Sequence, residues 1–145
     1  MNLRSLPEKR KKESPGSKTK KVKKKKLRSL SKLKQDLWEI FRHYIYKRDN
    51  FTCFTCDKTN LQGRDCQAGH FIKASVCGIM LYFDEENVHC QCSYCNGPLD
   101  GEQYLYGQKL GEMVVERIRQ DRLKYKGAAW DRKKYMEMIE FYKEK

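Results

Sequence analysis

The chain of 145 residues is long enough for one small domain with extensions, and with 39% hydrophobic and 35% charged residues it cannot bury a large core. A structural metal is a common source of further stability at this size. The sequence has no apolar run of 18 residues and no apolar segment near its N-terminus, which excludes a membrane span and a secretory signal. We therefore expect an intracellular protein whose seven cysteines are reduced.

The net charge of +13 is concentrated at the N-terminal end. Residues 1–34 hold fifteen Lys or Arg and two Glu, whereas residues 35–145 hold seventeen basic and seventeen acidic side chains. We expect residues 1–26 to be a disordered basic arm, and residues 27–145 to form the folded domain. Lysines bind phosphate without reading sequence, so the arm is expected to contact DNA, through Lys23, Lys24, Lys25 and Lys26. A solubilising tail or a nuclear import signal is the alternative.

Apolar residues at helical spacing predict a helix over residues 30–46, and Asp49-Asn50 is expected to end it. The segment 51–55 has strand character, although the first cysteine pair interrupts it. Residues 66–72 and 87–91 are short strand candidates.

Residues 73–86, between the last two strand candidates, are expected to be a loop of about fourteen residues, long enough to suggest a functional role. One or two helices are expected after Gly101, with Gly107 and Gly111 as weak points. Asp131 is a plausible N-cap for a last helix.

Two C-x-x-C pairs, Cys53 with Cys56 and Cys92 with Cys95, can place four thiolates around one ion. This set predicts a closed, tetrahedral structural zinc site. The 35 residues between the pairs predict an inserted element. Buried or redox-active thiols are the alternative. The three remaining cysteines are expected to be small buried hydrophobic residues: Cys66, Cys77 and Cys90.

The chain has three histidines, of which two lie between the cysteine pairs. His43 falls in the first predicted helix and is expected to be a packing or surface residue. His70 and His89 each fall on a short predicted strand. A zinc site made of two cysteines and both of these histidines is disfavoured, because their separation does not match the short spacing of such sites.

The order of motifs is more specific. The segments "AGHF" (68–71), "NVHCQC" (87–92) and "CSYCN" (92–96) resemble the HNH or His-Me finger nucleases. The spacing of "AGHF…YFDEENVHCQCSYCNGPLDG…Y" most resembles the phage recombination nuclease family of lambda NinG, also called Rap, from about Trp38 to the C-terminus. The resemblance implies an α+β fold with a small zinc-bound ββα-metal nuclease core and flanking helices. It also implies an endonuclease that hydrolyses branched recombination intermediates such as Holliday junctions or D-loops.

The resemblance also implies roles for individual residues. His70 matches the general base, and histidine has a suitable pKa for taking a proton from water; a backbone carbonyl can hold its other N–H. Asn96 matches the ligand of a catalytic Mg²⁺ or Mn²⁺, for which an amide oxygen is a suitable hard donor. Asn87 matches a structural position that ties the loop to His70. His89 is expected either to bind the catalytic metal or the scissile phosphate, or to lie at the surface.

One position departs from the wider superfamily, whose members often carry a metal-binding Asp before the base. Here that residue is Gly69, so either His89 or water is expected to complete the coordination, or the metal is expected to be held more weakly. Arg64 and Lys73 are candidate contacts for the flanking phosphates. As isolated charges, they are equally compatible with solvated side chains.

Branched DNA is the expected partner, with a homodimer and recombination proteins as further expectations. The helix at residues 30–46 or the C-terminal helices would supply the dimer surface. If the protein is encoded by a phage, it acts in the cytoplasm of the bacterial host. Two alternatives are a duplex nickase without preference for DNA structure and a non-catalytic zinc-knuckle DNA-binding protein.

Overall fold

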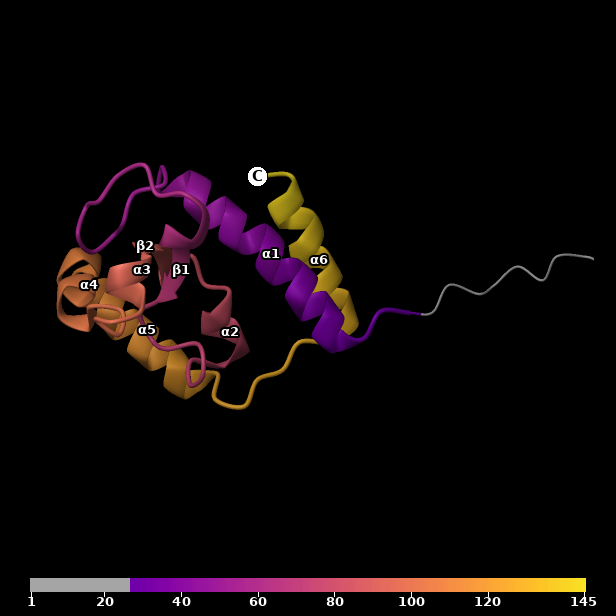
Figure 1. Cartoon of the computed structure of the whole chain (residues 1–145). Coiled ribbons are helices and arrows are strands. Elements are labelled where there is room, and N and C mark those ends of the chain that lie inside the picture. Colours follow the sequence, from indigo (N-terminus) through magenta and orange to yellow (C-terminus); the bar gives the residue numbers. More distant parts are fainter. Residues whose placement is uncertain (1–26) are drawn as a thin grey trace, which may run out of the picture.

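A computed structural model describes residues 27–145 (Figure 1). In this part of the chain a two-stranded antiparallel sheet lies among six α-helices and one short 3-10 helix, η1 (Gly63–Asp65). The fold is therefore a small mixed α+β arrangement. The predicted arm and its four lysines, residues 23–26, lie outside the described residues.

Helix α1 (Leu30–Arg48) confirms the predicted first helix. The hydroxyl of Ser29 caps its N-terminus by accepting a hydrogen bond from the backbone N–H of Lys32. The chain leaves the helix at Asp49, as predicted. Four of the five side chains that α1 buries recur every four residues, which gives one apolar stripe: Leu33, Leu37, Phe41 and Ile45.

Helix α6 (Arg132–Lys143) lies alongside α1 and covers this stripe (Figure 1). Its predicted N-cap is confirmed, because the Asp131 carboxylate accepts a hydrogen bond of 2.8 Å from the backbone N–H of Lys134. The rings of Phe41 and Tyr142 meet edge to face at 5.0 Å. The apolar stripe of α1 is thus buried within the chain.

Strands β1 (Cys66–His70) and β2 (Val88–Cys92) form the sheet. In their register His70 lies opposite Val88, and Gly69 lies opposite His89. Directly opposite side chains share a face and successive ones alternate. One face, which includes His70, packs toward α1 through Ala68. The other face carries the side chains of Gln67, His89 and Gln91, together with the Cα of Gly69.

Two expectations were wrong. The segment 51–55 is turn and loop, not strand, because Asn50 and Phe51 have positive φ angles and the chain folds back at the first cysteine pair. It still borders the sheet through a backbone hydrogen bond of 2.7 Å, from the N–H of Phe54 to the carbonyl of Cys90. Residues 73–86 are not a continuous loop, because helix α2 (Gly78–Tyr82) forms there and buries Leu81.

The remaining helices follow the sheet: α3 (Ser93–Asn96), α4 (Gln103–Leu110) and α5 (Glu112–Lys124). Gly111, with φ of +83°, separates α4 from α5 as predicted. Gly107 does not interrupt α4, and a Cβ at this position would make an ordinary contact of 3.4 Å with the ring of Phe71. None of the helices in residues 27–145 has the length and apolar character that crossing a membrane requires.

Candidate functional site

The two cysteine pairs meet in space. Cys53 and Cys56 lie in the turns after α1, Cys92 ends β2 and Cys95 lies in α3. All four sulfur atoms lie within 4.8 Å of one another. Zinc bound to four thiolates at about 2.3 Å would separate the sulfur atoms by about 3.8 Å. The Sγ atoms of Cys56 and Cys92 are 3.8 Å apart. The cluster therefore fits a metal ion such as zinc.

The thiols of the cluster differ in acidity. Burial alone would raise the pKa of Cys53, but hydrogen bonds from the backbone of Cys56 and the hydroxyl of Thr55 outweigh burial and lower this pKa to about 6. Burial and the neighbouring sulfur atoms raise the pKa of Cys95 to about 12. A bound cation would stabilise all four thiolates together. The remaining cysteines are buried, as predicted: Cys66, Cys77 and Cys90.

His70 ends β1 between two aromatic rings. Its ring stacks on Trp38 at 5.4 Å between centroids, and the ring of Tyr82 lies at 4.9 Å. Its Nε2 lies 3.1 Å from the backbone carbonyl oxygen of Tyr82. Burial, with a smaller effect from the charge of Lys34, lowers the pKa of His70 to about 4. The ring is therefore neutral at pH 7. Its Nε2–H donates to Tyr82, so Nδ1 is the basic nitrogen.

This pKa predicts a pH-dependent stability. The unfolded-state pKa is 6.5, so acidification favours proton uptake by the unfolded chain. His70 should therefore remove about 2 kcal/mol of unfolding free energy between pH 7 and pH 5. Urea unfolding of the wild type and of His70→Gln at both pH values measures this difference. Any effect of pH on the cysteine cluster is common to both proteins and cancels when the two are compared. The exposed His43→Gln is the control; the same pH dependence in all three proteins would contradict the prediction.

Asn87 connects the two segments that surround His70. It is fully buried just before β2. Its Oδ1 accepts a hydrogen bond of 2.8 Å from the backbone N–H of Ile72. Its Nδ2 donates at 2.9 Å to the carbonyl of Leu81, one residue before Tyr82. Asn87 thus ties the chain after β1 to α2, which supplies the carbonyl that holds His70.

His70 and Asn96 line one hollow of about 270 Å³. Lys73 also lines it and forms an ion pair of 2.5 Å with Asp100. A second hollow of about 500 Å³ contains Arg64. Both hollows have Trp38 and Ala68 in their walls, so they adjoin. The structure thus brings four of the predicted site residues to one stretch of surface: His70, Asn96, Lys73 and Arg64.

His89 lies elsewhere. Its ring stacks on Phe54 at 3.9 Å between centroids, and its Nδ1 lies 3.1 Å from the hydroxyl oxygen of Tyr106. It lines a separate hollow with Asp57 and Lys109. Burial, with a contribution from the charge of Arg48, lowers its pKa to about 4. The structure therefore does not bring His89 to the hollow that contains His70 and Asn96, where a metal-binding role had been considered.

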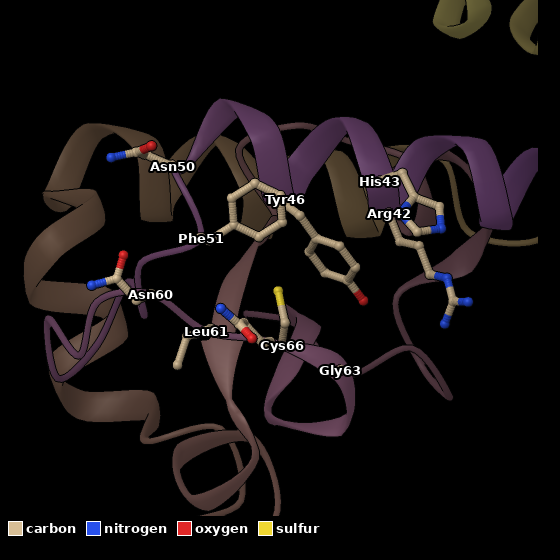
Figure 2. Close-up of a pocket in the computed structure, with 10 residues that line it drawn as sticks. Arg42, His43, Tyr46, Asn50, Phe51, Asn60, Leu61, Gly63 and Cys66 are labelled. Carbon is tan, nitrogen blue, oxygen red and sulfur yellow. The ribbon is translucent and has the colours of Figure 1, made fainter.

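Another hollow, of about 510 Å³, lies beside the C-terminal half of α1 (Figure 2). Tyr46, Phe51 and Cys66 contribute to its walls, and the exposed His43 lies at its edge. Its described lining contains none of the predicted site residues, and His43 is a surface residue.

Two residues of the site were missed in the sequence. Trp38 lies within the predicted first helix and was assigned no role, because its contact with His70 depends on how α1 crosses the sheet. Gln91 is fully buried beside Gly69 and Asn96. Only the register of the sheet reveals it, because that register places Gln91 on the face that Gly69 leaves without a side chain.

These features define a small α+β protein with a four-cysteine cluster that can bind metal, next to a hollow lined by a half-buried neutral histidine and an asparagine. The chain belongs to the family of the bacteriophage lambda NinG protein, whose family model matches residues 2–145. Neither the curated proteins nor the solved structures contain a significant match to the chain.

Proposed function

We propose that the protein is a metal-dependent DNA endonuclease that hydrolyses branched recombination intermediates, with His70 as its general base. The observation that carries the proposal is the hollow shared by His70 and Asn96. Membership of the NinG family supports it. So does the order of elements, a hairpin with His70 on its first strand and a helix with Asn96 after its second, which resembles the His-Me finger core.

His70 would act through a single nitrogen. The Tyr82 carbonyl accepts the hydrogen bond from Nε2–H and fixes the ring, so Nδ1 takes the proton of the attacking water. A general base works best when its pKa lies near the working pH, and burial holds this pKa lower, at about 4. An anionic phosphate in the hollow would raise the pKa toward neutrality, because a negative charge stabilises imidazolium.

Asn96 would hold the catalytic cation. Its Nδ2 donates a hydrogen bond of 2.7 Å to Oε1 of Gln67, which fixes the amide and leaves Oδ1 as the available donor atom. An amide oxygen suits a hard cation such as Mg²⁺ or Mn²⁺, which would neutralise charge on the phosphate and the leaving 3′-oxygen. Asn96 follows Cys95 directly, so the cysteine cluster fixes its position.

Basic side chains surround this hollow. Lys73 lies at its rim, and Arg64 and Arg42 line the adjoining hollow. The ammonium group of Lys34 lies 4.1 Å from the ring centroid of Tyr82, which flanks His70. These cations would bind phosphates on either side of the scissile bond. The preference for branched DNA rests on the resemblance to the recombination nucleases.

A cleavage assay tests the proposal. The full chain, loaded with zinc, should cut a four-way junction or a D-loop in Mg²⁺ faster than a linear duplex of the same sequence, and EDTA should stop the reaction. Equal rates on branched and linear DNA would indicate a nickase without structural preference. Binding to DNA without cleavage in Mg²⁺ or Mn²⁺ would overturn the nuclease proposal and favour a non-catalytic DNA-binding protein.

A further inference from the structure

Gln91 has an amide whose orientation is fixed but whose oxygen is unused. The side chain is fully buried on β2. Its Nε2 donates hydrogen bonds to the Gly101 carbonyl at 2.9 Å and to the Thr55 hydroxyl at 3.3 Å. Its Oε1 is buried and has no hydrogen-bond partner within residues 27–145. Leaving a buried polar atom without a hydrogen bond destabilises the fold, so this atom requires an explanation.

The unused oxygen faces Gly69. A Cβ at this position would lie 1.9 Å from Oε1 of Gln91 and 2.9 Å from Oδ1 of Asn96. The two amide oxygens therefore lie close to the same position, which Oε1 of Gln91 can occupy only because Gly69 has no side chain. The NH₂ groups of both amides are bonded elsewhere, that of Asn96 to Gln67. Two acceptor oxygens thus lie beside the same glycine, and Oε1 of Gln91 has no donor within residues 27–145, an arrangement that a cation would stabilise.

This place adjoins the hollow of His70. Asn96 and Gly101 line that hollow, and the Gln91 amide donates a hydrogen bond to the Gly101 carbonyl. Gln91 is also connected to the cysteine cluster, because the Thr55 hydroxyl that accepts its hydrogen bond lies 3.2 Å from the Cys53 sulfur. The cluster therefore positions both amides, Gln91 through Thr55 and Asn96 through Cys95.

We propose that Gln91 Oε1 and Asn96 Oδ1 are paired ligands of one divalent cation of the Mg²⁺ or Mn²⁺ class, a role that rests on the proposed nuclease function. Gln91 supplies the second protein oxygen ligand of the cation, because residue 69 is a glycine and has no side-chain oxygen to offer. This role explains the unused oxygen, and it explains why residue 69 has no side chain. A Cβ there would displace the Gln91 amide.

The test measures binding of Mn²⁺ to the zinc-loaded full chain without DNA, by isothermal titration calorimetry. Gln91→Met retains the length of the side chain and removes the oxygen. It should weaken Mn²⁺ binding roughly tenfold or more, whereas zinc content should remain at one per chain. An unchanged affinity for Mn²⁺ in Gln91→Met would overturn the proposal.

A pair of double variants separates ligand loss from packing damage. Gly69→Asp/Gln91→Ala returns oxygen donors to the same place, whereas Gly69→Leu/Gln91→Ala returns a similar volume without them. The first should bind Mn²⁺ at least about tenfold more tightly than the second. Equal affinities would overturn the ligand role even if Gln91→Met proves unstable. If the wild type binds Mn²⁺ tightly but cuts no DNA, only the nuclease function is overturned. If the wild type cuts DNA and the Gln91 variants bind Mn²⁺ as tightly as it does, only this inference is overturned.

Discussion

His70→Ala should lower the rate of DNA cleavage by about 10²–10⁴-fold, the usual contribution of a general base. The substitution removes the Nδ1 atom that would take the proton from water, and no other histidine lies in the described hollow. DNA affinity should change little, because His70 is neutral at pH 7 and the phosphate contacts are assigned to basic side chains. Single-turnover cleavage and a separate binding measurement in Ca²⁺ distinguish the two effects.

Two controls make this result specific. His43→Ala removes a histidine that is exposed on α1, and it should cleave at the wild-type rate. His70→Gln fills more of the space between Trp38 and Tyr82 than alanine does, so it limits any collapse of the aromatic contacts. If both His70 variants remain folded and cut at the wild-type rate, His70 is not the base.

Cys53→Ser should release the bound zinc and unfold much of the domain. The side chain is fully buried, and its sulfur is one of the four that converge. Structural zinc contributes on the order of 10 kcal/mol in small zinc-binding domains, which exceeds the stability of most domains of this size. Zinc stoichiometry and thermal melting by circular dichroism measure the two consequences on the same sample.

Cys77→Ser is the matched control. Cys77 is also buried, but it packs with Phe71 and Leu81 and lies outside the cluster. It should retain its zinc and lose at most about 1–3 kcal/mol, as expected for a buried polar substitution. A Cys53→Ser protein that melts like Cys77→Ser and retains one zinc would show that the cluster is not a structural metal site.

The parts of the fold that were predictable depend on local patterns. The four-residue spacing of apolar side chains identified α1, and the cap at Asp131 identified the start of α6. The two C-x-x-C pairs identified the cluster because tetrahedral coordination demands four ligands at short spacings. Both strands of the hairpin were located to within two residues at each end.

The parts that were missed depend on contacts between distant segments. Residues 51–55 have strand-forming side chains, but the turn at the cysteine pair overrides that local preference. The position of His89 depends on the register of β1 against β2, which places His89 on the opposite face of the sheet from His70. Gln91 becomes conspicuous only when the same register is known, because its oxygen fills the space above Gly69.

The packing of α6 on α1 has a consequence for the order in which the protein folds. The two helices join the beginning and the end of the described chain; Arg132, for example, donates a hydrogen bond to the carbonyl of Arg28, 104 residues away. Closing so long a loop costs entropy before any contact repays it, so this pairing should form late. The apolar stripe of α1 should therefore be covered only after the last helix has docked, and a partly synthesised chain would leave it exposed.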